Sequence, residues 1–81
     1  MQEELALILD DVLALKGRAR ALTADSRLLG ALPELDSMAV IAVLEEIQRK
    51  YAIQIADDDI DGRMFATLGS LTDFVRDKTR H

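Results

Sequence analysis

The sequence contains no cysteine, and its only histidine, His81, is the last residue. Without cysteine the chain can form no disulfide, no zinc–thiolate site and no thiol nucleophile. A single histidine at the end of a chain, where residues are usually poorly ordered, supplies no base for a Ser-His-Asp or Cys-His catalytic set. The composition therefore argues against an enzyme that acts alone.

Aromatic residues are also scarce, at 4% of the chain, although hydrophobic residues reach 49%. The apolar content is mostly leucine, alanine, valine and isoleucine, which favour thin helical bundles over folds with a large ligand cavity. The longest uninterrupted apolar runs, residues 5–9 and 38–44, are far too short to span a membrane. Acidic residues follow Met1, unlike the basic start of a signal peptide. We expect one domain over residues 1–81 in a soluble, cytoplasmic and monomeric protein.

The net charge of −5 is unevenly distributed. Residues 34–61 carry eight acids and only two bases. Because such a surface repels phosphate backbones, we expect no nucleic-acid partner and favour a protein partner with a basic patch. The aspartates of residues 57–61 lack the alternating ligands and the final glutamate of a calcium-binding loop, so no metal site is expected.

Helical periodicity predicts three longer helices, at about residues 2–16, 37–51 and 68–79. The acid run at 57–61 suggests a short helix between the second and third of these, ended by Gly62. Residues 17–36 show no clean period yet contain five leucines, so this long loop should cross the bundle and bury them. The predicted fold is all-α, a small four-helix bundle with a long first loop and a short third helix.

Side-chain spacing also predicts the helix caps and the core. Asp36 is the expected N-cap of the second long helix, with Ser37 its first residue, and Thr67 is favoured over Ser70 as the N-cap of the last helix. On the second long helix, Met38 is expected to begin the inward stripe, which continues through Ile41 and Leu44. The residues expected to be largely buried are Leu9, Val12, Ile41, Leu44, Ile47, Leu71 and Val75.

The segment Leu35-Asp36-Ser37-Met38, followed by Ile41, Leu44, Glu45 and Glu46, resembles the Asp-Ser-Leu helix start of acyl and peptidyl carrier proteins. The resemblance extends over nearly the whole chain, down to the Thr67-Leu68 entry to the last helix. It implies a carrier rather than an enzyme. Ser37 would accept a covalent 4′-phosphopantetheine from coenzyme A through a separate magnesium-dependent phosphopantetheinyl transferase. Asp36 would cap the helix and orient the incoming group.

Three departures from that family pattern affect the expected partners. Glu34 stands where the family often has glycine, so the loop should avoid a positive φ there, and Met38 replaces the usual leucine. The acidic outward face of the helix is replaced at Ala39, Ala42, Gln48 and Arg49. The resemblance then implies a specialised, stand-alone bacterial carrier. The residues expected to contact its acyl-loading and acyl-transferring enzymes are Met38, Ala39, Val40, Ala42, Glu45 and Glu46.

The leading hypothesis is an acyl carrier protein of lipid or fatty acid biosynthesis, which holds an acyl intermediate as a thioester on its phosphopantetheine arm. A peptidyl or aminoacyl carrier is the alternative within the same class. A different class is an unmodified helical interaction module that binds a basic partner through residues 34–61.

Overall fold

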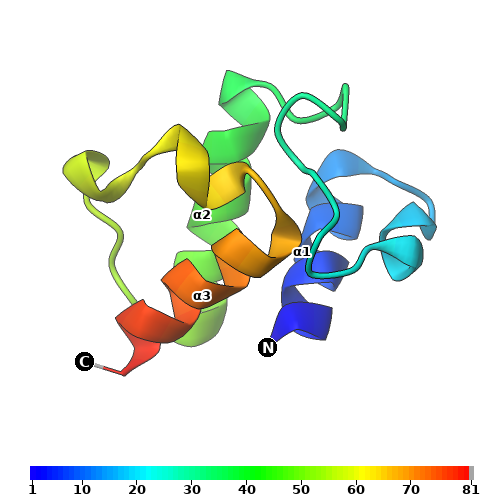
Figure 1. Ribbon diagram of the computed structural model, residues 1–81. Coiled ribbons are helices and arrows are strands. Elements are labelled where there is room, and N and C mark those ends of the chain that lie inside the picture. Colours follow the sequence, from blue (N-terminus) through cyan, green and yellow to red (C-terminus); the bar gives the residue numbers. More distant parts are fainter. Residues whose placement is uncertain (81) are drawn as a thin grey trace.

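The computed structural model describes residues 1–80, except for the side chain of Asp57, and His81 lies outside this range. Three α-helices, α1 (Gln2–Leu13), α2 (Ser37–Tyr51) and α3 (Leu68–Thr79), form the framework (Figure 1). Three short 3-10 turns, η1 (Arg18–Ala21), η2 (Asp57–Asp59) and η3 (Gly62–Phe65), lie between them. Extended pairing within residues 1–80 is limited to one isolated bridge, between Arg27 and Thr67. The all-helical prediction is therefore confirmed.

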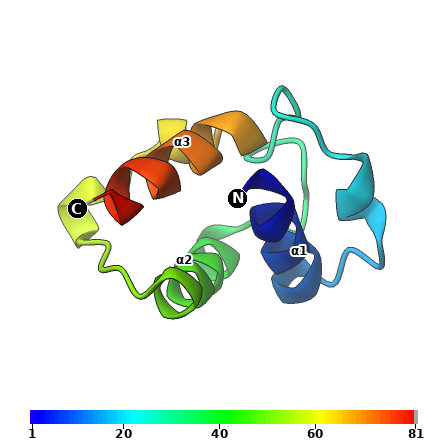
Figure 2. The same cartoon turned by 90° about the horizontal axis from the view of Figure 1, so that it is seen from below.

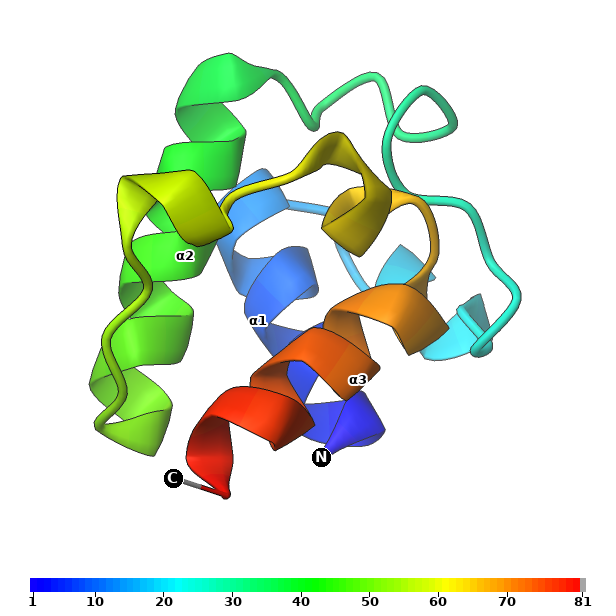
Figure 3. The same ribbon diagram turned by 60° about the vertical axis from the view of Figure 1, so that its left-hand side comes forward.

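The helices α1 and α2 run antiparallel, and α3 lies across one side of this pair (Figures 1 and 2). Helix α1 packs against both other helices, whereas α2 and α3 make little direct backbone contact. The segment between α1 and α2, residues 14–36 and here called loop I, passes around the outer side of α1 and then reaches the start of α2 (Figure 3). Helix α2 consequently lies at one edge of the bundle.

Helix α1 ends at Leu13, three residues earlier than its periodicity suggests. Ala14 adopts a left-handed conformation with φ of 53°, and this turns Leu15 back into the core, where it is almost completely buried. The Asp10 carboxylate accepts hydrogen bonds from the amides of Gly17 (2.9 Å) and Ala19 (3.3 Å), so it caps the start of η1. Burial of Leu15 and this side-chain cap together stop the helix before residue 16.

The expected short third helix is not an α-helix but two 3-10 turns, η2 and η3, so the count of four helices is corrected to three. Aspartate is a poor helix former because its side chain competes for nearby backbone amides. Asp61 does this at the start of η3, where its carboxylate accepts from the Arg63 amide at 2.9 Å. Asp59 accepts from Ala56 N and from the Lys78 ammonium at 2.7 Å, which ties η2 to α3.

The other two helices have the predicted bounds and caps. Asp36 caps α2 by accepting from the Ala39 amide at 2.8 Å. Thr67 caps α3, and Ser70 completes a capping box with it through a reciprocal pair of 3.0 Å hydrogen bonds. Both helix starts were recognisable because short polar side chains precede an apolar stripe.

Most of the predicted core residues are buried. Leu9, Leu44, Ile47, Leu71 and Val75 are inaccessible or nearly so, and Val12 packs partly buried against them. The predictions that Met38 begins the inward stripe and that Ile41 continues it are wrong, because these side chains are 73% and 51% exposed. The buried face of α2 is instead formed by Val43, Leu44 and Ile47. The core therefore covers the side of α2 that carries these residues and leaves Ile41 on the uncovered side.

The loop leucines behave mostly as expected. Leu28 and Leu35 are buried, Leu22 and Leu32 pack partly buried, and Leu29 remains 46% exposed. Four backbone hydrogen bonds hold the middle of loop I against η3 and the start of α3. These bonds run from Leu28 N to Ala66 O, Leu29 N to Phe65 O, Leu68 N to Ser26 O and Gly69 N to Ala24 O, at 2.8–3.1 Å. The loop is therefore an ordered part of the bundle.

Candidate functional site

Ser37 is the first residue of α2, at the point where loop I joins the helix. The preceding residue, Asp36, is extended and uses its carboxylate to cap the Ala39 amide. This cap fixes the direction in which the chain enters the helix. Both Asp36 and Ser37 are exposed, so the predicted site residues lie together at the surface.

Ser37 differs from the other two serines of the chain. The Ser26 hydroxyl accepts a hydrogen bond from the Thr23 amide at 2.8 Å, and the Ser70 hydroxyl belongs to the α3 capping box. Both of these side chains are half-buried. The Ser37 hydroxyl, by contrast, is exposed and has no hydrogen-bond partner within residues 1–80. It is the serine hydroxyl best placed to react with an external group.

The surroundings of Ser37 suit an attached phosphate ester. The amides of Ser37 and Met38 lie in the first turn of α2, where helix geometry supplies no acceptor, and no other acceptor among residues 1–80 replaces one. Unpaired amides and the positive end of the helix dipole favour an anion at such a position. A phosphodiester on Ser37 Oγ would therefore gain favourable electrostatics without displacing the Asp36 cap.

An exposed apolar patch lies next to Ser37 on α2. Met38 is 73% exposed and Ile41, one turn further along, is 51% exposed. Glu45 is exposed, while Glu46 forms an ion pair with Arg49 at 2.9 Å. The charged residues of α2 are two acids and two bases, so its formal charge is zero: Glu45, Glu46, Arg49 and Lys50. Sequence reasoning missed Ile41 because its spacing from Leu44 also fits an inward stripe.

Ala39 and Gln48, predicted on the outward face of the helix, and Val40, predicted to contact partner enzymes, are less exposed than expected. Ala39 and Val40 pack partly buried against the core, so Val40 is replaced by Ile41 in the exposed patch. Gln48 is held between α2 and the following segment. Its amide oxygen accepts from Ile55 N at 2.9 Å, and its amide nitrogen donates to Leu44 O at 3.2 Å. Nothing in a single sequence distinguishes such a structural glutamine from a surface one.

Glu34, three residues before Ser37, is bonded to the Arg18 guanidinium of η1. Positive φ angles outside glycine occur at Ala14, Lys16 and Ala52 within residues 1–80, so the prediction that Glu34 avoids one is confirmed. A backbone hydrogen bond at Glu34 itself and the Arg18 side chain hold the pKa of the Glu34 carboxyl below its ordinary value. Sequence spacing gave no sign of this pair, since the partners are 16 residues apart.

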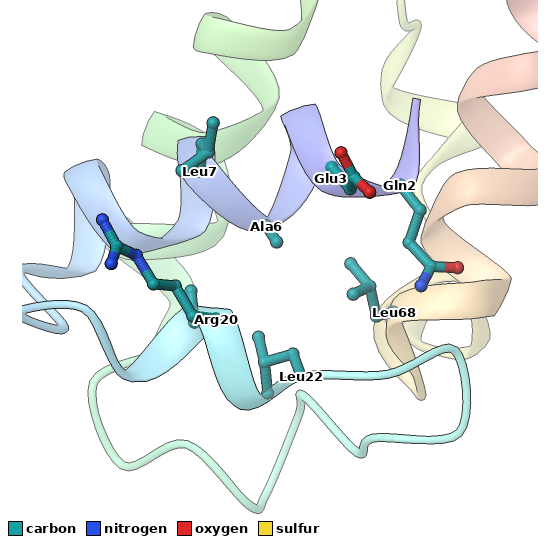
Figure 4. Close-up of a pocket in the computed structure, with 8 residues that line it drawn as sticks. Gln2, Glu3, Ala6, Leu7, Arg20, Leu22 and Leu68 are labelled. Atoms are coloured by element: carbon teal, nitrogen blue, oxygen red, sulfur yellow. The ribbon is translucent and has the colours of Figure 1, made fainter.

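A separate open groove of about 320 Å³ lies between the start of α1, η1 and Leu68 of α3 (Figure 4). Ala6, Leu7 and Leu22 give it an apolar lining, and Glu3 and Arg20 lie at its rim. None of the predicted site residues lines it. Among the side chains that the structure describes, residues 1–80 without Asp57, no three carboxylate or histidine groups are arranged to hold a metal ion. Within the same range no helix has the length and apolar character needed to cross a membrane.

The sequence profile of the family described as "Phosphopantetheine attachment site" matches residues 3–75. The solved structures include a holo acyl carrier protein from Nitrosomonas europaea with 46% sequence identity to this chain. The two superpose with a TM-score of 0.92, over 99% of this chain and 96% of the other. No curated protein sequence gives a significant match. The chain therefore belongs to the acyl carrier protein family, the carriers that bear a covalently attached 4′-phosphopantetheine.

Proposed function

We propose that Ser37 is the attachment site and that the chain carries an acyl group as a thioester at the end of the phosphopantetheine arm. The observation that carries this proposal is the position of Ser37: an exposed, unengaged hydroxyl on the first turn of a capped helix, inside the matched residues. A thioester requires a thiol, and this cysteine-free chain has none of its own. The arm supplies that thiol.

The attachment reaction follows from the geometry of the helix start. Within the transferase, the Ser37 hydroxyl attacks a phosphorus of coenzyme A, and a base of that enzyme takes the hydroxyl proton. A new P–O bond forms to Ser37 Oγ while the adenosine bisphosphate half leaves. The chain itself contributes the accessible hydroxyl, held by the Asp36 cap, and the first-turn amides that favour the resulting phosphodiester. The chain acts as substrate and carrier rather than enzyme, in the cytoplasm and as a monomer.

Intact mass measurement tests the attachment site directly. The protein is incubated with coenzyme A and a promiscuous phosphopantetheinyl transferase, and one phosphopantetheine should be added. Ser37→Ala should stay folded, because Asp36 retains the cap, and should gain no mass. Ser26→Ala is the matched control and should be modified like the wild type. Modification of Ser37→Ala would show that the site is assigned wrongly, and an unmodified wild type would favour the interaction-module alternative.

The same family includes the peptidyl and aminoacyl carriers that the sequence left as an alternative. The enzyme that loads the arm decides which group this chain holds. The mass of the protein isolated from its native host distinguishes the two, because an acyl chain and an aminoacyl group add different masses to the arm. An aminoacyl mass would overturn the proposal of an acyl carrier and leave the attachment site intact.

We infer that partner enzymes bind α2 through apolar contact by Met38 and Ile41, with Glu45 and Glu46 beside them. The zero formal charge of α2 gives little long-range attraction for a basic enzyme surface, so binding should depend weakly on salt. Enzymes of general fatty-acid synthesis, which we expect to require an acidic helix, should use this carrier poorly. The zero formal charge of α2 thus supports a specialised carrier with its own partners.

Substitution at the exposed patch tests this inference. Ala39 and Ala42 are both half-buried, so they are unsuitable for adding charge. Met38→Glu and Ile41→Glu change exposed side chains and should cost little stability. Both should improve acylation by a general fatty-acid synthesis enzyme and make its rate more sensitive to salt. Leu7→Glu on α1, where the side chain is 60% exposed, is the control. Equal rates and salt slopes in all variants would contradict a specialised face on α2.

A further inference from the structure

We propose that Arg18 and Glu34 form a positioning pair that fixes the end of loop I, residues 30–36, and so presents Ser37 to the phosphopantetheinyl transferase. The inference rests on the proposed function, since it concerns how the same hydroxyl is offered for modification. It assigns a role to a residue of η1 that lies 19 positions before the attachment site.

The need for such a pair follows from how loop I is anchored. Backbone hydrogen bonds to η3 and α3 hold the loop as far as Leu29. From Gly30 to Asp36 the backbone bonds are local, reaching back no further than Leu28. Within residues 1–80, the contact between Arg18 and Glu34 is the polar link that joins this last segment to a distant part of the chain. Apolar contact supplies the other restraints, since Leu35 is buried in the core and Leu32 packs partly buried against it.

Arg18 is itself held in place. Its Nε donates to the carbonyl of Leu15 at 3.1 Å, and Leu15 is buried after the left-handed turn that ends α1. The guanidinium therefore starts from a fixed position on the bundle, with a further N–H group directed at the Glu34 carboxylate. A restrained donor of this kind loses less side-chain freedom on forming the pair than a mobile one.

The Glu34 carboxylate depends on Arg18 as its side-chain hydrogen-bond donor. One oxygen is bonded to Arg18, while the other, Oε1, is shielded from solvent and has no partner within residues 1–80. If Arg18 were lost, neither oxygen would have a side-chain donor, and a carboxylate that keeps only the backbone hydrogen bond at Glu34 is better solvated by turning towards water. The carboxylate would then leave η1, and the loop end that precedes Ser37 would move with it.

This mechanism makes a specific kinetic prediction. We assume that the transferase binds the conformation in which Arg18 and Glu34 are paired. The apparent affinity of a variant for the transferase then falls in proportion to the fraction of molecules that still adopt this conformation. KM should therefore rise while kcat stays unchanged, because Ser37 itself and its cap are intact once bound. Exposed ion pairs are weak, so the rise should be about three- to fivefold.

The test measures kcat and KM of a promiscuous phosphopantetheinyl transferase with coenzyme A for four proteins: wild type, Arg18→Gln, Arg20→Gln and the double variant Arg18→Gln/Glu34→Gln. Arg20 is the matched control, since it lies in the same turn, loses the same charge, and forms no ion pair within residues 1–80. Arg18→Gln should raise KM and Arg20→Gln should not. The double variant should show about the same rise in KM as Arg18→Gln, because the link between η1 and the loop end is absent in both. Thermal melts should be alike for all four.

Each alternative result has a distinct meaning. An unchanged KM for Arg18→Gln would overturn the positioning role. Equal rises for Arg18→Gln and Arg20→Gln would overturn it in favour of general charge attraction. A double variant worse than Arg18→Gln, or a lower melting temperature that parallels KM, would show a purely structural contribution and overturn it too. Absence of any modification in the wild type, or modification of Ser37→Ala, would instead refute the proposed function on which the inference rests.

Discussion

Replacing Gly69 with alanine tests the anchoring of loop I most sharply, because local and tertiary effects have opposite signs. Gly69 is the second residue of α3, and alanine in a helix is more stable than glycine by up to about 1 kcal/mol. In the folded bundle, however, a Cβ on Gly69 would lie 2.8 Å from the carbonyl oxygen of Ala24 and 3.3 Å from its Cβ. The Gly69 amide also donates to that oxygen at 2.8 Å.

The steric effect should exceed the gain in helix propensity. The closest atom is backbone, which cannot move aside as a flexible side chain can, so loop I or α3 must shift. Overpacking of this kind costs about 1–3 kcal/mol. After subtracting the propensity gain, we expect Gly69→Ala to lower the free energy of unfolding by about 1 kcal/mol. For a domain of this size that corresponds to a fall in melting temperature of about 4–8 °C.

Urea denaturation followed by far-UV circular dichroism measures the change, with Gly62→Ala as the matched control. Gly62 begins η3, has no atom within 4 Å of a Cβ, and requires no positive φ, so its replacement should be neutral or slightly stabilising. Hydrogen exchange should also quicken at the amides of Leu68 and Gly69 in Gly69→Ala. If that variant were as stable as the wild type, the close contact between Ala24 and α3 would not hold the loop as argued.

Three further measurements examine other contacts. Burial, and then a hydrogen bond to Glu4 at 2.9 Å, raise the pKa of Tyr51 to about 12 from 10.0; as this is the only tyrosine, phenolate absorbance reports it directly. Because the folded pKa is the higher one, this contribution to stability is complete below pH 10 and is lost as pH rises towards 12. Glu4→Gln should lower this pKa only part of the way, and titration at the ordinary value would contradict burial of the ring. Leu44→Ala should cost about 2–5 kcal/mol in urea denaturation, and a loss below about 1 kcal/mol would mean that this face of α2 is not packed. Gln48→Ala should lower the free energy of unfolding by about 1–3 kcal/mol and speed hydrogen exchange of the Ile55 amide. Unchanged exchange would argue against the hydrogen bond between Gln48 and Ile55.

The parts of the fold that were predictable are those set by local chemistry. Helix α2 and its Asp36 cap, and α3 with Thr67, follow from a short polar side chain before an apolar stripe. The position of Asp36 and Ser37 at a helix start follows from the same cap, whereas the attachment role of Ser37 was predicted only from the resemblance to carrier proteins. These features depend on neighbours within one helical turn, which the sequence displays directly.

The parts that were missed depend on tertiary contacts. The left-handed Ala14 exists because Leu15 must reach the core, and no residue near Ala14 signals it. Ile41 is exposed because the bundle covers the side of α2 that carries Val43, Leu44 and Ile47, which the periodicity of the helix alone cannot show. The pair of Arg18 with Glu34 joins residues 16 apart through a loop whose path is set by α3. Each case requires knowledge of where a distant element packs.

The bonds between loop I and the start of α3 also impose an order on folding during synthesis. They join residues 24–29 to residues 65–69, so the loop that leads to Ser37 obtains its anchors only after most of the chain has been made. Closing such a distant contact carries an entropic cost that α1 and α2 alone have no means to offset. Ribosome-bound chains halted before residue 65 should therefore be poor substrates for the transferase, and chains in which residues 65–69 have been made and released should become good ones. We therefore expect arm attachment to follow the packing of residues 65–69 against loop I.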